Sequence, residues 1–231
     1  RLGQIKTDEK SNEITAIPKM LDTLDIKGAT VTIDAMGCQV AIAEKIVSCE
    51  AVYLLALKKN QPNLYESVEE YFKWARTEPI EKKQLKEYRY EEHEHGRHIY
   101  RSIEVCNDVS WIETVREWKQ LSSIICVTRK GEREGRQTEE TAYYISSREW
   151  EAEEVAKCIQ GHWSIENNLH WSLDTAFNED ESQIYRGHAQ ENLSVVRKIA
   201  QGLLKSETTF KGGSIRRKSN RAAMSDEYAE L

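Results

Sequence analysis

A carboxylate lies in the middle of an apolar helical stripe in the last third of the sequence. If residues 156–177 form a helix, steps of three and four residues place seven side chains on one face. They are Ala156, Ile159, Trp163, Glu166, His170, Leu173 and Phe177. Because burying an unpaired carboxylate is costly, the pattern indicates that Glu166 binds a cation, a metal ion or a proton. The alternatives are hydrogen bonds to His162 or His170, one turn away on either side, or a metal site made with these histidines.

A second candidate carboxylate follows a short apolar run near the N-terminus. Asp34 ends the predicted strand 30–34, and the Ala-Met-Gly segment after it can turn tightly and leave the carboxylate uncovered. Ligand sites in open α/β sheets form outside the carboxyl ends of parallel strands. A strand-end aspartate that meets a helix glutamate in space suggests a divalent metal site. The alternative is that Asp34 caps a helix or turn.

Polar side chains also follow the next apolar run, residues 51–57. If this strand is parallel and adjacent to the strand before Asp34, then Lys58, Asn60 and Gln61 lie near that carboxylate. They then bind phosphate or orient a nucleotide. An ordinary polar loop is the alternative.

Two further groups of potential metal ligands have simpler explanations. Residues 91–98 are dense in glutamate and histidine, with His93 and His95 on one face of a strand and His98 close by. A solvated hairpin tip accounts for them as well as a metal site does. The five cysteines lack CxxC spacing, which argues against a zinc site. Because Cys38, Cys49 and Cys126 lie in or next to apolar segments, we interpret these three as reduced structural thiols.

The order of predicted elements indicates an α/β fold. A strand at 2–6, a helix starting near Thr15 with Pro18 in its first turn, and strands at 30–34 and 51–57 around a helix at 39–48 predict a largely parallel sheet. The apolar run 51–57 is typical of a strand covered on both faces.

In the middle of the chain the predicted elements change from alternating strands and helices to hairpins. After a helix at 64–74 we expect two hairpins. One spans 88–104 and turns near Gly96, and the other joins 121–128 to 141–147 through the charged loop 131–139. Helices return after Trp150. The last long helix, 189–205, has a predicted apolar stripe made of Leu193, Val196, Ile199, Ala200 and Leu203.

Composition restricts the possible partners. The 231 residues include 39% hydrophobic and 31% charged residues, enough for one large domain or a core with an insertion. A net charge of −6 argues against nonspecific coating of nucleic acid, but the segment 211–221 is a basic tail that DNA can contact locally. No apolar run approaches the roughly 18 residues of a membrane span, and no signal peptide opens the chain, so we expect a cytosolic protein without a membrane partner. Because the chain opens at Arg1 on a predicted strand, we expect a fragment of something longer.

Three sequence phrases resemble a known family. KSNEITAIPKMLDTLDIKGATVTIDAMGCQ, YLLALKKNQ and GHWSIENNLHWSLDTAFNED closely resemble the H-repeat-associated insertion-sequence transposases of the DDE transposase superfamily. The resemblance covers nearly the whole chain, including the basic tail. It implies a ribonuclease-H-like core of mixed sheet flanked by helices, with a β-rich insertion before the helix of the catalytic glutamate. The expected segments are 1–62 and 151–208 for the core, 63–150 for the insertion and 209–231 for the tail.

The resemblance also implies roles for individual residues. Asp34 matches the second catalytic aspartate and Glu166 the catalytic glutamate, so both are expected to bind Mg²⁺ or Mn²⁺. His162 falls where related transposases often carry an arginine, and Leu173 stands where a lysine is common. The expected DNA-binding residues are Lys58, Asn60, Gln61, His162, Asn167, Lys211, Arg216, Arg217, Lys218 and Arg221.

The expected activity is Mg²⁺-dependent cleavage and transfer of DNA strands, with element ends and target DNA as partners and a homo-oligomer assembled on DNA. In a bacterial cell such a protein is cytoplasmic and associates with the nucleoid when it binds DNA. The family's first aspartate has no match here, since Asp8 lies in a polar turn, so we expect impaired catalysis by this chain. The alternatives are a catalytically inactive DNA-binding remnant and a metal-dependent nuclease of the same fold.

Overall fold

The chain forms two compact units, Arg1–Ile159 and Gln160–Leu231. A computed structural model describes residues 13–79, 85–94, 97–133, 136–165, 171–179, 181–184 and 186–230. The predicted strand at 2–6 and the residues of the turn near Gly96 lie outside the described residues.

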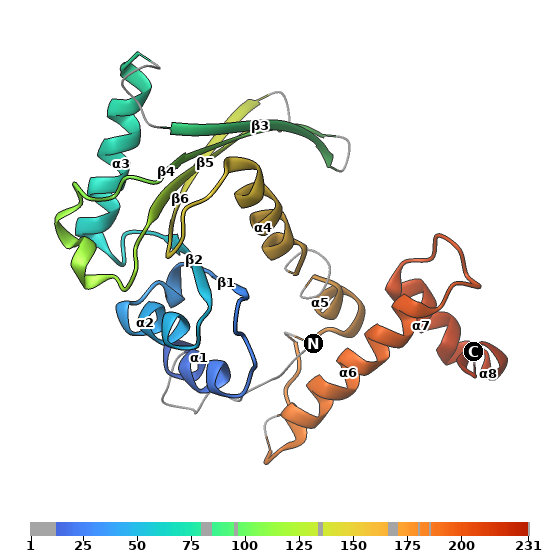
Figure 1. The fold of residues 1–231 in the computed structure, drawn as a ribbon. Helices are drawn as coiled ribbons and strands as arrows, with labels where there is room; N and C mark the ends of the chain where they lie inside the picture. Colours follow the sequence, from blue (N-terminus) through green and yellow to red (C-terminus); the bar gives the residue numbers. More distant parts are fainter. Residues whose placement is uncertain are drawn as a thin grey trace. The chain divides into compact units, whose positions relative to one another are not determined.

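Unit 1 is built on one mixed sheet (Figure 1). Its strands are β1 (Thr30–Ile33), β2 (Val52–Leu57), β3 (Leu85–Glu94), β4 (Arg97–Cys106), β5 (Ser123–Arg133) and β6 (Arg136–Ser146). The order across the sheet is β1-β2-β6-β5-β4-β3. The β1–β2 pair is parallel, and the other neighbouring pairs are antiparallel. Because β6 bonds directly to β2, the two hairpins extend the same sheet that contains the parallel pair.

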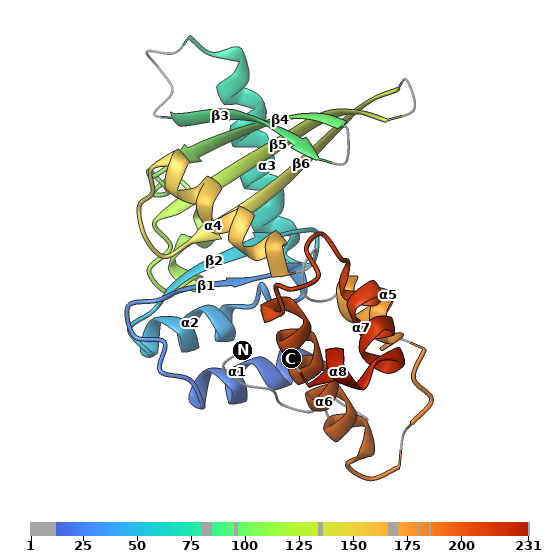
Figure 2. The same ribbon diagram turned by 90° about the vertical axis from the view of Figure 1, so that its right-hand side faces the viewer.

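Helices flank this sheet. The helices are α1 (Glu13–Asp22), α2 (Val40–Ser48), α3 (Pro62–Thr77) and α4 (Ala152–Ile165). Viewed from the side, α3 and the beginning of α4 lie on opposite faces of the sheet (Figures 1 and 2). This arrangement confirms the predicted fold class, a mixed sheet flanked by helices that is consistent with a ribonuclease-H-like transposase core.

The apolar pattern explains the centre of unit 1. In β2, Tyr53, Leu54, Leu55 and Leu57 are almost completely buried, as expected for a strand covered on both faces. The helix α2 turns Ile42, Ala43 and Ile46 into the same core, at the spacing of one helical face. Burial of these side chains fixes the position of β1 and β2, and therefore of the residues that come after them.

Two local predictions were wrong. The helix α1 begins at Glu13, which places Pro18 inside the helix rather than in its first turn. The predicted charged loop 131–139 is mostly strand, because β5 and β6 pair as far as Arg133 opposite Arg136. Cross-strand ion pairs support this extension, including Lys130 with Glu139 at 3.1 Å.

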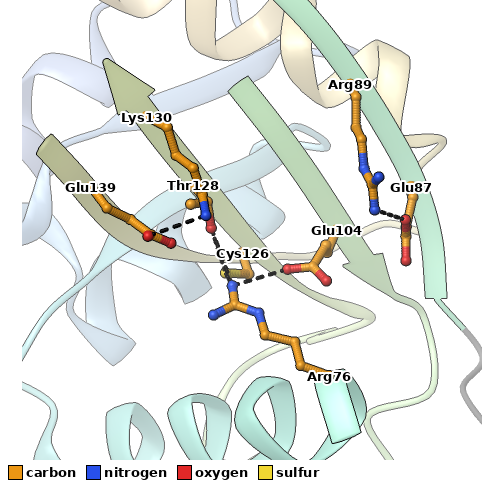
Figure 3. Close-up of polar contacts among 8 residues, drawn as sticks. All are labelled: Arg76, Glu87, Arg89, Glu104, Cys126, Thr128, Lys130 and Glu139. Carbon is orange, nitrogen blue, oxygen red and sulfur yellow. Dashed lines mark hydrogen bonds and ion pairs between the residues drawn. The ribbon is translucent and has the colours of Figure 1, made fainter. Parts of the chain in front are cut away.

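One polar cluster joins the last turn of α3 to the sheet (Figure 3). The Arg76 guanidinium donates to Glu104 Oε2 at 3.1 Å and to Thr128 Oγ1 at 3.1 Å, and it lies 3.3 Å from Cys126 Sγ. The Glu104 side chain is only 10% exposed. Burial raises the pKa of the Cys126 thiol to about 12, so this thiol stays neutral beside the guanidinium. Arg76 therefore supplies the positive charge that compensates a largely buried carboxylate.

Replacing Arg76 with methionine is expected to destabilise the protein by about 2 kcal/mol, because Glu104 then keeps a buried charge without its partner. This value is below the usual cost of breaking a fully buried pair, since the Arg76 side chain is 41% exposed. Arg89→Met is the matched control. Arg89 lies on the same face of the sheet and pairs with Glu87 at 2.9 Å, but it is 74% exposed. Urea denaturation should show less than about 0.5 kcal/mol for Arg89→Met, and equal losses in both variants would contradict the assignment.

Unit 2 is helical. Besides the end of α4, its helices are α5 (Trp171–Phe177), α6 (Ala189–Ser206), α7 (Ile215–Met224) and α8 (Asp226–Ala229). The apolar stripe predicted for α6 is not the face buried within unit 2, since Val196, Ile199 and Leu203 are each more than half exposed. A polar residue is buried in its place. Gln201 donates to Ser172 Oγ, so its side chain satisfies its hydrogen bonding inside the unit. None of the helices in the described part of the chain is both long and apolar enough to cross a membrane.

Candidate metal site and DNA-binding residues

The carboxylate of Asp34 stands at the carboxyl end of β1. Asp34 is exposed and takes the capping position of the 3-10 turn Ala35–Gly37, in an extended backbone conformation. Its side chain makes no capping hydrogen bond. Asp34 therefore occupies the position of a capping residue, but its side chain does not act as a cap. Within the described ranges no side chain donates to this carboxylate, which leaves both oxygens available to a ligand.

The turn after Asp34 packs closely beneath β1. A Cβ atom added at Gly37 would lie 2.3 Å from Cγ2 of Ile33, so only glycine fits here without movement. The next residue, Cys38, is completely buried, and burial raises the pKa of its thiol to about 12. The close approach of this turn to β1 explains why a glycine is found three residues after Asp34.

The strand arrangement brings a second segment to Asp34. Because β1 and β2 are parallel neighbours, with Ile33 opposite Leu55, the residues after β2 lie at the same edge of the sheet as Asp34. Lys58 is exposed there. The Asn60 amide donates to the Ala35 carbonyl at 2.8 Å, and the Gln61 amide donates to the Cys38 carbonyl at 3.0 Å. These two amides bind the protein backbone of the turn, a role that the sequence did not indicate.

The remaining predicted residues of the metal site are partly outside the described residues. Glu166 and Asn167 fall in the undescribed segment 166–170, between α4 and α5, and His162 is half-buried in α4. No group of three or more histidine, cysteine, aspartate or glutamate side chains that could hold a metal ion occurs among the described residues. Of the predicted ligands, the structure therefore describes only Asp34, whose exposed carboxylate oxygens suit a hard divalent cation.

The histidine-rich hairpin adds no described ligand cluster. His98 Nε2 lies 3.0 Å from Glu91 Oε2 across the β3–β4 pair. The His93 side chain and His95 are outside the described residues. All five cysteines are free thiols.

The basic residues of the predicted tail differ in exposure and in what their side chains contact. Lys211, Arg216 and Arg217 are exposed, and Ser214 caps the helix α7 by accepting a hydrogen bond from the Arg217 N–H. Their side chains are therefore open to solvent. Arg221 is also exposed, but its guanidinium lies 5.0 Å from the ring centre of Phe210 and 4.9 Å from that of Tyr228, where it stabilises the packing of the unit.

Lys218 differs from the other predicted DNA-binding residues because it is buried. Its ammonium donates to the Leu204 carbonyl at 3.0 Å and lies 3.2 Å from Glu207 Oε2. The same carboxylate accepts a 2.6 Å hydrogen bond from the Tyr228 hydroxyl. This cluster joins α6, α7 and α8. The sequence spacing within α7 does not reveal this cluster, because the partners of Lys218 come from outside that helix. The ammonium of Lys218 is buried and bonds to groups of the protein itself.

The cluster predicts a pH dependence for unit 2. Hydrogen bonds from Thr209, then from Tyr228 and the Phe210 N–H, hold the pKa of Glu207 well below its ordinary value of 4.5. A lowered folded pKa stabilises the fold at pH values above the unfolded pKa, and this contribution is lost as the pH falls through the folded pKa. The difference in melting temperature between the wild type and Glu207→Gln should therefore be largest above about pH 5 and shrink toward pH 3. Glu227→Gln, an exposed control on α8, should show no such trend in circular dichroism melts.

Comparison with known proteins decides the family. A model of the transposase DDE domain matches residues 2–203. The chain belongs to the DDE transposase family. It is 44% identical to the H repeat-associated putative transposase YhhI of Escherichia coli K12, over 98% of this chain and 60% of that protein. It is equally similar to the putative protein YbfL of the same strain, and 40% identical to the putative transposase YncI of Escherichia coli O157:H7, over 99% of this chain and 59% of that protein.

The match covers only part of these relatives. This DDE transposase chain spans about 60% of the length of the curated relatives it matches. The family match covers β1, β2 and α4, and therefore the candidate position Asp34. It confirms the resemblance found in the sequence phrases. The roles of Asp34, Glu166 and the basic residues remain predictions about this chain.

Proposed function

We propose that this chain carries part of the catalytic centre of a transposase that cuts and joins DNA strands with Mg²⁺ or Mn²⁺. The observation that carries the proposal is the carboxylate of Asp34. It is exposed at the end of a parallel strand, no described residue donates to it, and it belongs to a domain of the DDE family. The family generally uses divalent metal ions, and an aspartate without a structural task at this place fits a metal ligand.

The chemistry requires carboxylates at fixed positions. Divalent ions bound there would activate a water or a DNA 3′-hydroxyl and stabilise the leaving oxygen. Asp34 and Glu166 would provide oxygen ligands from a strand end and from the segment after α4. The backbone of Asp34 is fixed at the end of β1 by the turn after it, since the Gly37 N–H donates to the Asp34 carbonyl at 3.1 Å.

Basic side chains in both units support DNA as the substrate. We assign phosphate contacts to Lys58 beside Asp34 and to Lys211, Arg216 and Arg217 in the tail, because all four are exposed cations. His162 and Asn167 are proposed to line the DNA path near Glu166. We propose that the partners are element ends and target DNA, that a homo-oligomer assembles on them, and that the protein acts on the bacterial nucleoid.

The reaction products test this function. Protein expressed from the complete gene is mixed with labelled duplexes that contain element ends and with a supercoiled plasmid, with and without Mg²⁺. Joined products that require Mg²⁺ support strand transfer. Cleavage without joining would assign the protein to metal-dependent nucleases instead, and binding without cleavage would make it an inactive DNA-binding protein.

A further inference from the structure

Two residues after β2 form hydrogen bonds with the turn that follows the candidate metal ligand Asp34. The strands β1 and β2 lie side by side as a parallel pair (Figure 2). Asn60 and Gln61 come three and four residues after β2, at the same edge of the sheet as the turn that starts at Asp34. We propose that Asn60 and Gln61 are positioning residues, whose side-chain amides hold the turn after Asp34 and so fix the direction of its carboxylate. This proposal rests on the proposed role of Asp34 as a metal ligand.

The hydrogen bonds are directed at the first and last parts of the turn. The Asn60 amide reaches the Ala35 carbonyl at 2.8 Å and also lies 3.5 Å from the Cys38 carbonyl. The Gln61 amide donates to the Cys38 carbonyl at 3.0 Å and to Gln39 Oε1 at 3.3 Å. Since carbonyl oxygens only accept hydrogen bonds, the nitrogen of each carboxamide must face the turn. Carboxylates at positions 60 and 61 could not make these contacts.

The turn needs such support from outside. Its own backbone bonds are Gly37 N–H to the Asp34 carbonyl at 3.1 Å, Cys38 N–H to the Ala35 carbonyl at 3.2 Å and Gln39 N–H to the Gly37 carbonyl at 2.9 Å. The side chain of Asp34 adds none. If Asp34 binds a metal ion, its carboxylate cannot also hold the turn, so the orientation must come from neighbouring groups. Outer groups that orient a ligand commonly change metal affinity by about 10–100-fold when they are removed.

This geometry separates positioning from direct DNA contact. An amide that contacts phosphate must point to the solvent, whereas both amides here point to main-chain carbonyls of the same unit. Loss of Asn60 or Gln61 should therefore weaken metal binding at Asp34 and leave DNA affinity almost unchanged. A direct role in DNA binding predicts the reverse.

The test uses the chain itself with Fe²⁺ in place of Mg²⁺. In the presence of ascorbate and peroxide, bound Fe²⁺ generates radicals that cut the backbone close to the metal, and mass spectrometry locates the cut. The wild type should be cut near residue 34, and Asp34→Asn should abolish the cut. Asn60→Asp and Gln61→Glu, which keep the side-chain shape but remove the amide donors, should raise the half-saturating Fe²⁺ concentration by about tenfold or more. Asn63→Asp is the matched control, because Asn63 is an exposed asparagine in the first turn of α3.

The outcomes distinguish this proposal from the proposed function. No cut near residue 34, or an unchanged cut in Asp34→Asn, would overturn the metal assignment and with it the positioning role. A cut that is lost in Asp34→Asn but keeps its iron dependence in Asn60→Asp and Gln61→Glu would overturn positioning alone. Asn60→Ala serves as a second variant, in which hydrogen exchange of the backbone amides of residues 35–39 should accelerate about fivefold with the melting temperature nearly unchanged. Unaltered exchange in this variant would also count against the proposal.

Discussion

Asp34→Asn is expected to reduce Mg²⁺-dependent DNA cleavage and joining by about a thousandfold or more. The substitution keeps the shape of the side chain and removes the negative charge that would bind the metal ions. It should not disturb the fold, because Asp34 is exposed and its side chain caps nothing. Its effect on the free energy of unfolding should stay within about 0.5 kcal/mol, which is typical of surface substitutions. DNA affinity should change little.

The measurement is the rate of strand cleavage by protein expressed from the complete gene, followed by denaturing gels at several Mg²⁺ concentrations. Asp25→Asn is the matched control. Asp25 is also an exposed aspartate, but it precedes β1 and so lies away from the carboxyl end of that strand. The control should retain wild-type activity. Full activity of Asp34→Asn, with correct folding shown by its melting curve, would remove Asp34 from the catalytic centre.

The fold was predictable where burial determines the pattern. The unbroken apolar run of β2 indicated a strand covered on both faces, and Leu54 and Leu55, which lie on opposite faces, are indeed both buried. The long β5–β6 hairpin was underestimated. Its outer part is charged on both strands, a pattern that resembles a solvated loop, whereas pairs such as Arg129 with Glu140 and Lys130 with Glu139 form only when the strands lie side by side. The local sequence does not contain that information.

In the candidate site, too, local features were predictable and contacts between distant residues were not. That Asp34 would be uncovered at a strand end could be inferred from the strand and the Ala-Met-Gly turn, both local features. The direction of the Asn60 and Gln61 amides depends on hydrogen-bond partners more than twenty residues away. Lys218 was predicted to contact DNA from its place in a basic run, but the acceptors that surround it come from Leu204 and Glu207. Charge along a sequence shows that cations are present and not which of them are buried.

The structure therefore predicts a selective effect on DNA binding within the tail. Replacing Lys211, Arg216 and Arg217 together with alanine should weaken binding to duplex DNA by about tenfold or more at low salt. Removing one phosphate contact lowers the slope of log affinity against log salt concentration by about 0.9. If all three side chains contact phosphate, the slope should fall by about 2–3. Fluorescence anisotropy with a labelled duplex measures both quantities. The salt concentration is varied between about 50 and 300 mM, the range over which phosphate contacts dominate affinity.

Two variants show whether the effect is specific. Lys218→Met removes a cation from the same helix, yet it should lower the melting temperature and leave the salt slope unchanged, because the ammonium is buried against Glu207 and the Leu204 carbonyl. Arg186→Ala removes an exposed cation of unit 2 outside the tail and should change neither quantity. If Lys218→Met lowers the salt slope as much as the loss of an exposed arginine does, the ammonium must leave its buried site to reach DNA. An unchanged slope in the triple variant would place the phosphate contacts elsewhere, with Lys58 beside Asp34 as the next candidate.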